Sequence, residues 1–125
     1  MELMLALAIT GILTLFSIPL YSHHVVHEKR LEAEIQLSAL ASALEQYYAL
    51  HNSYKNATLN NLHIPEKIAN NQYQLAISSQ NESSFMLEAV PLDNQAKKDT
   101  SCGTLLLDSD GTKGIKGSGN ILNCW

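Results

Sequence analysis

Basic residues are scarce in this chain. Its 125 residues include 8 Lys and Arg against 12 Asp and Glu, which gives a formal net charge of -4 at pH 7. A protein that coats nucleic acid needs a basic excess to hold the phosphates at physiological salt. The composition therefore argues against general DNA coating, and charge gives no indication of a nucleic acid partner. Near the C-terminus the two signs are balanced, with Lys97, Lys98, Lys113 and Lys116 set against Asp93, Asp99, Asp108 and Asp110.

Motifs for catalysis are absent from the sequence. It contains no nucleophile–base pair, phosphate-binding loop or strong metal motif, so we expect no enzymatic activity, no cofactor and no metal. His23 and His27 have the i,i+4 spacing that can bind a metal, but only Glu28 lies close enough to add a ligand. Asp108–Gly111 resembles part of a calcium loop without its further ligands. Solvated histidines and a hairpin turn are the simpler interpretations.

Charge is also absent from Leu3 to Ser22. As a helix this segment would be about 30 Å long at about 1.5 Å per residue, roughly the thickness of the hydrocarbon core of a bilayer. A cleaved signal peptide needs a basic start and a shorter apolar run, whereas this chain starts with Met1 and Glu2. We therefore expect residues 1–22 to form an apolar, transmembrane helix.

The helix is expected to continue to residue 51. Residues 1–51 would then form one rod of about 75 Å, with an apolar half over 1–22 and an amphipathic half over 23–51. Gly11 and Pro19 should weaken or kink this rod. In the second half, apolar or aromatic residues recur at alternating steps of four and three, which places them on one face: Ala33, Leu37, Leu40, Leu44 and Tyr47.

Residues 52–125 are predicted to form a globular head of class α+β. An Asn-rich loop over 52–72 precedes three expected strands, over 73–78, 85–90 and 104–108, which form a small antiparallel sheet packed on the helix. Cys102 and Cys124 are the only cysteines. An even pair in a small domain favours a disulfide formed in an oxidising compartment, and two unrelated buried thiols are the alternative.

The charges that flank the apolar segment do not agree with an oxidising compartment for the head. The first basic residues, Lys29 and Arg30, follow the apolar segment, and the positive-inside rule would place them in the cytoplasm together with the head. The cysteine pair favours the opposite side. An orienting signal is therefore missing from the N-terminal end of this sequence.

The segment from Glu2 to Leu13 resembles the N-terminus of type IV pilins. In that family prepilin peptidase removes a short basic leader, and a glutamate stands near the start of an apolar helix. Glu2 matches this glutamate, and Gly11 and Pro19 match the glycine and proline that weaken the family's helix. The Cys102 and Cys124 pair resembles the family's disulfide-closed C-terminal loop. Among subtypes, the short body and the Tyr47-Tyr48 pair are most similar to a PilE-type minor pilin.

The resemblance implies a structural function. The chain would be a minor pilin that enters the filament through its apolar helix, with Glu2 paired to the N-terminal amine of a neighbouring subunit. Its partners would be other pilin subunits, the inner membrane, prepilin peptidase and the pilus assembly platform. The head would be periplasmic before assembly and extracellular in the pilus afterwards. Such a pilus would support twitching motility, adhesion or DNA uptake, and the family's N-terminal residue is methylated.

The sequence departs from the family at its first residue. The leader, the cleavage site and the first mature residues are not present, and Met1 stands where the family usually has Ile or Val. One hypothesis is a start codon placed too late, with Gly-Phe-Thr-Leu encoded in frame upstream. The alternatives in function are a major pilin, a type II secretion pseudopilin, or a membrane-anchored module that captures DNA or another ligand outside a filament.

Overall fold

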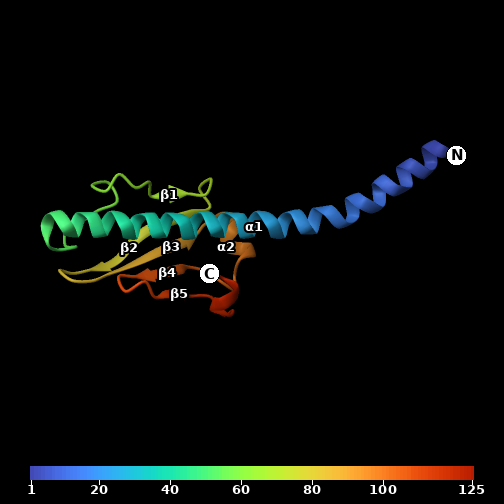
Figure 1. Ribbon diagram of the computed structural model, residues 1–125. Helices are drawn as coiled ribbons and strands as arrows, with labels where there is room; N and C mark the ends of the chain where they lie inside the picture. The colour runs from blue at the N-terminus through green and yellow to red at the C-terminus, as the bar shows by residue number, and fades with distance from the viewer.

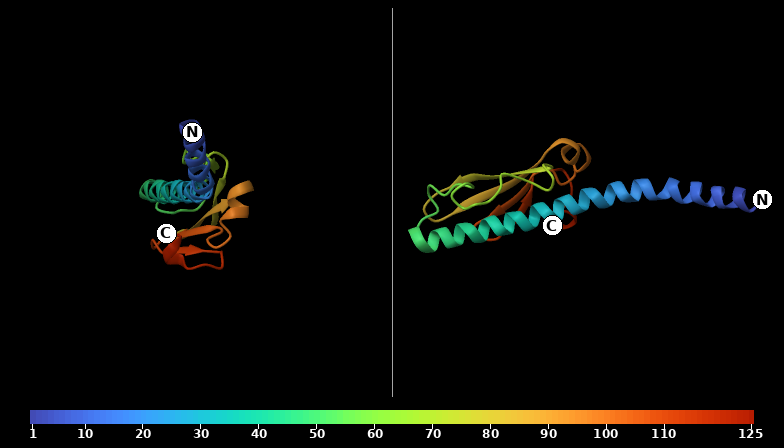
Figure 2. Two further views of the ribbon diagram at one scale, coloured as in Figure 1. Left: turned by 90° about the vertical axis from the view of Figure 1, so that its right-hand side faces the viewer. Right: turned by 90° about the horizontal axis from the view of Figure 1, so that it is seen from above.

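A long helix packed on a small sheet makes up the protein (Figure 1). The computed structural model describes residues 1–15 and 23–125. Helix α1 (Glu2–His51) carries the sheet along its C-terminal half, and its N-terminal end extends beyond the head (Figures 1 and 2). The predicted fold class, a long N-terminal helix on an antiparallel sheet with a disulfide-closed C-terminal region, is confirmed.

The C-terminal half of α1 is amphipathic in the way its sequence predicts. Four of the five predicted face positions have no exposed surface, and Tyr47 is half-buried: the four are Ala33, Leu37, Leu40 and Leu44. The helix ends at His51 because Asn52 adopts a left-handed conformation (φ 57°) and donates its backbone N–H to the Tyr48 carbonyl at 2.6 Å. Asn tolerates this conformation better than most residues, which makes it a common helix terminator.

The sheet has five antiparallel strands in the order β1-β2-β3-β4-β5. The three predicted strands are present as β2 (Tyr73–Gln80), β3 (Phe85–Pro91) and β4 (Leu105–Asp108). Two short edge strands, β1 (Lys67–Ile68) and β5 (Lys113–Ile115), were not predicted. They have two and three residues, too few to show an alternating pattern. The chain also forms two short helices, α2 (Asp93–Lys98) and the 3-10 helix η1 (Ile121–Asn123).

The core lies between α1 and one face of the sheet. Alternate residues of each central strand are buried against the helix, as the two-residue period of a strand requires: Tyr73 and Leu75 of β2, Phe85, Leu87 and Ala89 of β3, Leu105 and Leu107 of β4. Each large side chain buried in this way stabilises the fold by about 1.5–3 kcal/mol relative to leaving it exposed. Packing with α1, not helix propensity alone, therefore fixes the head.

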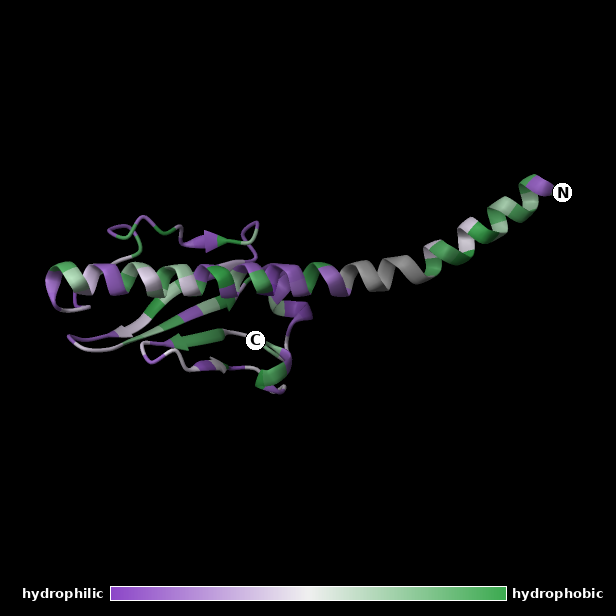
Figure 3. Ribbon diagram, viewed as in Figure 1, coloured by the Kyte–Doolittle hydropathy of each residue, from purple (hydrophilic) through white to green (hydrophobic). Residues whose placement is uncertain are grey.

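The N-terminal end of α1 is apolar over its surface (Figure 3). Within residues 1–15 and 23–125, no helix combines the length and the apolar character needed to cross a membrane. The expected spanning segment, residues 3–22, reaches into residues that lie outside this description. Pro19 lies outside it as well.

Candidate functional site

The first turns of α1 expose apolar side chains with nothing from the head to cover them. Leu3 and Leu7 are 81% and 72% exposed, and the same holds for the other large apolar residues as far as residue 15: Met4, Leu5, Ile9, Ile12, Leu13 and Leu15. Soluble proteins rarely leave so large a continuous apolar surface open, and such surfaces mark contacts with a membrane or with other proteins. The apolar half of α1 is thus a candidate contact surface.

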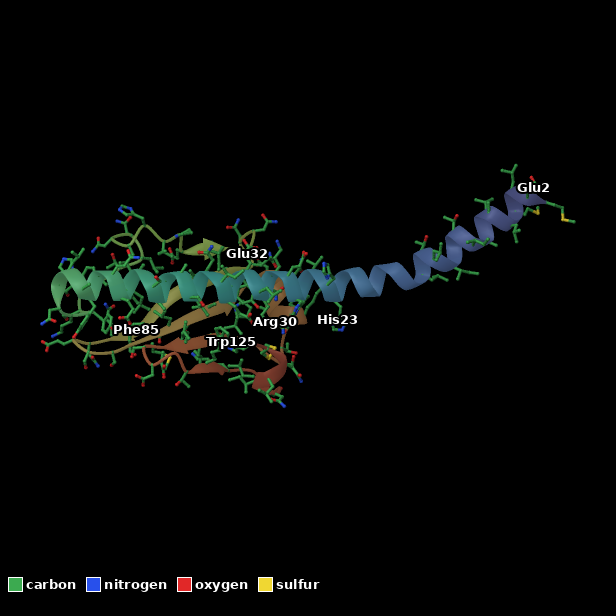
Figure 4. All side chains as sticks on the ribbon, in the orientation of Figure 1. Glu2, His23, Arg30, Glu32, Phe85 and Trp125 are labelled. Atoms are coloured by element: carbon green, nitrogen blue, oxygen red, sulfur yellow. A yellow bond between two sulfur atoms is a disulfide. The ribbon has the colours of Figure 1, made fainter. Side chains whose placement is uncertain are left out.

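Glu2 lies at the free end of this apolar half, far from the head (Figure 4). It stands in the first turn of α1, where the helix dipole favours a negative charge. Among the residues that the structure describes, no hydrogen bond or ion pair to the Glu2 carboxylate is observed. Its charge is therefore available to a group outside this chain.

Gly11 and two threonines affect how the surface of the apolar half could pack against another molecule. A Cβ added at Gly11 would meet no atom of the described chain within 4 Å, so this glycine is not required by packing inside the chain. The hydroxyl groups of Thr10 and Thr14 donate to the carbonyls of Ala6 and Thr10 at 2.8 and 2.7 Å. Because their hydrogen bonds are satisfied within the helix, the two threonines leave no unsatisfied donor on the apolar surface.

The Cys102–Cys124 disulfide forms as predicted. The S–S distance is 2.06 Å, the Cα atoms are 5.7 Å apart, and both residues are buried. Closing a loop of this length stabilises the folded chain by about 3 kcal/mol, because it restricts the unfolded state. The bond ties the C-terminal end of the chain to the segment that follows α2.

A polar network joins the disulfide region to α1. The Arg30 guanidinium donates through Nε to Asp99 Oδ2 at 3.1 Å and through Nη1 to the Asn123 carbonyl at 3.1 Å. Asp99 is only 3% exposed and also accepts from the Tyr73 hydroxyl at 3.3 Å. Gln95 donates to the same hydroxyl and to the Val26 carbonyl of α1, both at 3.0 Å. We call Arg30, Tyr73, Gln95 and Asp99 the polar lock.

The sequence did not identify this lock. Arg30 was interpreted there as a membrane-flanking charge, and Asp99 as a balance for nearby lysines. Only a buried-residue pattern around 95 and 99, four positions apart on α2 and its C-cap, could have suggested it.

Burial raises the pKa of the Tyr73 hydroxyl. Burial also raises the pKa of the Glu34 carboxyl, although the nearby positive charges of Arg30 and Lys113 act to lower it.

The C-terminal residue Trp125 packs on the head. Its indole N–H donates to the Gly114 carbonyl at 3.0 Å, and the Lys113 ammonium lies 5.2 Å from its ring centroid (Figure 4). At the other end of the head, Tyr47 stacks on His51 with ring centroids 4.0 Å apart. The first contacts hold the C-terminus on β5, and the second lies within the last turns of α1.

Two of the candidate metal ligands, Glu28 and Asp108, have other partners. His24 Nε2 lies 3.0 Å from a carboxylate oxygen of Glu28, and Asp108 Oδ1 accepts from the backbone of Asp110 and Thr112 at 2.9 Å. Asp108 therefore stabilises the hairpin turn between β4 and β5. No cluster of three or more metal-binding side chains occurs in residues 1–15 and 23–125.

A comparison with known families identifies the family to which this chain belongs. Residues 19–106 match the model of a family described as type IV minor pilin ComP, DNA uptake sequence receptor. The match covers more than half of the chain. The chain belongs to this family of type IV minor pilins. The function expected from the N-terminal resemblance, a minor pilin of a type IV pilus, is thereby confirmed.

Solved pilin structures show the same fold. The non-core minor pilin PilV of Neisseria meningitidis is 22% identical, with 75% of this chain and 92% of that chain covered and a TM-score of 0.53. A type IV pilin from Shewanella oneidensis is 26% identical, with 80% and 97% covered and a TM-score of 0.55. Comparison with curated proteins finds no match.

The matched family and structures also indicate the kind of protein and its partners. The family and both solved structures are pilins, which are structural subunits and not enzymes. A pilin of this family interacts with other pilin subunits in an extracellular filament. No comparison tests the PilE-type subtype or the roles of Glu2, Gly11 and Pro19, which stay predictions.

Proposed function

We propose that this minor pilin uses the apolar half of α1 twice. Residues 3–22 first hold the subunit in the inner membrane, with the head in the periplasm, and then pack among other pilin helices in the filament. The observation that supports this proposal is the open apolar surface of residues 3–15, which nothing in the head covers. A bilayer and a bundle of apolar helices are the two environments that bury such a surface.

In this proposal Glu2 sets the position of the subunit in the filament. A carboxylate among apolar helices is costly unless it is paired, and the resemblance supplies the N-terminal amine of a neighbouring subunit as its partner. A misplaced subunit would leave both charges unpaired. Gly11 and Pro19 are proposed to weaken the helix so that it fits both environments.

Replacing Glu2 tests the proposal. Glu2→Ala should remove the protein from sheared surface pili, while flotation of membranes still finds it inserted. Glu32→Ala is the matched control, because Glu32 is an exposed glutamate on the same helix, beside the head (Figure 4). Wild-type amounts of the Glu2→Ala variant in pili would contradict the role of Glu2. Absence of the wild-type protein from pili would favour the anchored module outside a filament.

Processing by prepilin peptidase and docking on the assembly platform belong to the same proposal through the family resemblance. N-terminal sequencing and intact mass of the protein from sheared pili test the processing. A methylated N-terminal residue is expected. An unmethylated Met1 in the pilus fraction would contradict it. Twitching and adhesion assays on a deletion strain then show which activity of the pilus the subunit supports.

DNA uptake is a second proposed role, because the family description names a DNA uptake sequence receptor. The fold supports it by withdrawing one acid of the C-terminal segment from the surface: Asp99 is buried in the polar lock. Lys97 and Lys113 stay exposed in the same segment. The sequence has four lysines against four acids in this segment, and at the surface that balance shifts by one acid.

Duplex binding measured at several salt concentrations tests this role. Each of Lys97→Gln and Lys113→Gln should lower the slope of log affinity against log salt by about 1, if each lysine contacts a phosphate. Lys55→Gln, in the loop after α1, should leave the slope unchanged. Equal slopes for all three variants would contradict binding through this segment.

A further inference from the structure

A cavity of about 250 Å³ opens at the end of the head nearest to the apolar half of α1. Three separate segments meet there: α1, the turn between β1 and β2, and α2, as Figures 1 and 2 show. Two lysines and several carboxamides line it, among them Lys29 of α1, Asn70 and Gln72 of the turn, and Asn94 and Lys98 of α2. No established part of the pilin function assigns a role to this cavity.

The cavity is held by hydrogen bonds between its walls. The Gln72 carbonyl accepts from the Leu92 N–H at 2.7 Å, and its side-chain oxygen accepts from the Gln95 N–H at 3.2 Å. Gln95, only 2% exposed, donates to the Val26 carbonyl of α1. These bonds fix the turn and α2 against the helix, so contacts within the chain hold the walls of the cavity in place.

The turn that forms one wall is strained. Ala69, Asn70 and Asn71 are three successive residues with positive φ, at 54°, 57° and 63°. For Ala this conformation costs about 1 kcal/mol or more, and three in a row are rare. Such strain persists where the surrounding structure requires it, and here it places the Asn70 side chain at the cavity.

The lining chemistry selects an anion. Lys29 and Lys98 supply two ammonium groups, the carboxamides supply N–H donors, and no carboxylate is among the lining residues. The nearby acids are occupied or turned to solvent: Glu28 pairs with His24, Asp99 belongs to the polar lock, and Asp93 is exposed. A phosphate group fits this set of donors.

The position of the cavity along α1 indicates where such a phosphate would come from, because the cavity would lie close to the headgroup layer of a membrane. Lys29 stands seven residues beyond Ser22, about 10 Å along the axis from the end of the apolar segment. The headgroup layer is about 5–8 Å deep on each side of the hydrocarbon core. Side chains of a helix lean towards its N-terminus, so the ammonium of Lys29 reaches back towards that layer.

We propose that this cavity binds the phosphate of an anionic phospholipid while the subunit resides in the membrane. The proposal rests on the membrane residence in the proposed function. Val25 and Val26 line the cavity from the helix and give the headgroup an apolar side beside the two lysines. A lysine near an anionic surface contributes about a five- to sixfold gain in binding, so two give about thirtyfold. Binding of this strength orients the head and still releases the subunit for assembly.

The experiment measures which lipid stays bound to the full chain. The protein is reconstituted in nanodiscs of equimolar phosphatidylglycerol and phosphatidylcholine, and the lipids retained after detergent extraction are identified by native mass spectrometry. We expect phosphatidylglycerol to be preferred, and Lys29→Gln with Lys98→Gln to lower this preference about thirtyfold. Lys29→Arg with Lys98→Arg should keep it. Lys55→Gln with Lys67→Gln removes the same charge elsewhere on the head, at two exposed lysines, and should also keep it.

Three outcomes would overturn the proposal. The first is equal lipid preference in the Lys29/Lys98 and Lys55/Lys67 glutamine variants. The second is displacement of the lipid by millimolar inorganic phosphate, which would make the cavity a site for free phosphate. The third is displacement by a short DNA duplex, which would assign these lysines to nucleic acid. Flotation and the pilus shearing assay are read separately, so failure of membrane insertion or pilus entry identifies failure of the proposed function instead.

Discussion

Both halves of α1 are rich in leucine, but they differ in whether the rest of the chain covers the leucine side chains. Leu37 and Leu40, on the C-terminal half, have no exposed surface because the sheet packs on them. Leu3 and Leu7 stand in the open. In the proposed function one helix therefore meets two kinds of partner: its own chain on one half, and a membrane or other subunits on the other. The first kind of contact stabilises the head, and we propose that the second kind serves assembly.

Breaking the polar lock should have the largest effect on the covered half. Arg30→Ala would leave the Asp99 carboxylate, 3% exposed, without its cation, and removing one partner of a buried pair costs about 3–5 kcal/mol. Urea unfolding of the full chain in detergent, followed by tryptophan fluorescence of Trp125, measures this loss. Glu32→Ala, the exposed control, should change the free energy of unfolding by less than about 0.5 kcal/mol. Similar midpoints for the two variants would contradict a structural role for the lock.

The same change on each half of the helix tests the comparison directly. Leu37→Ala removes a fully buried side chain and should destabilise the head by about 2–5 kcal/mol. Leu7→Ala should leave urea unfolding of the head unchanged and instead reduce the amount of protein in sheared pili. If Leu7→Ala lowered the stability of the head as much as Leu37→Ala does, the two halves would not be independent.

The sequence predicted the parts of the fold that have a period. The steps of four and three from Ala33 to Leu44 placed the buried face of α1 correctly, and alternation placed β2, β3 and β4. The disulfide followed from the even number of cysteines. In each case a local pattern was long enough, or a residue type rare enough, to leave few alternatives.

The rest depends on contacts between residues far apart in the chain. Arg30 and Asp99 are 69 positions apart, and nothing in either segment marks them as partners. The cavity beside α2 likewise needs Lys29, Asn70 and Lys98 to be brought together by the fold. The edge strands β1 and β5 form because β2 and β4 offer them a ladder to pair with. Tertiary context decides such features, and local sequence does not.

At alkaline pH we expect a smaller difference between the two halves of α1, because only the covered half depends on a titrating group. Tyr54 follows the C-terminal end of α1, and burial together with its hydrogen bond to the Glu45 carboxylate, at 2.8 Å, raises the pKa of Tyr54 to about 12. The unfolded chain has the ordinary tyrosine pKa of about 10, so the folded state favours the neutral phenol. This contribution to stability is complete below about pH 10 and is lost as the pH rises towards 12.

Tyr54→Phe has no phenol to ionise and should therefore flatten the fall in stability between pH 10 and about 12. Near pH 8 it should be less stable than the wild type by about 0.5–1.5 kcal/mol, because the hydrogen bond to Glu45 is lost. Urea midpoints at both pH values give the two numbers, and the variant and wild-type curves should converge as the pH rises. A variant that declines as steeply as the wild type over this range would show that another group governs the alkaline loss. Circular dichroism of the full chain in detergent should retain the helical signal that the apolar half contributes over the same range, because its exposed leucines carry no proton to lose.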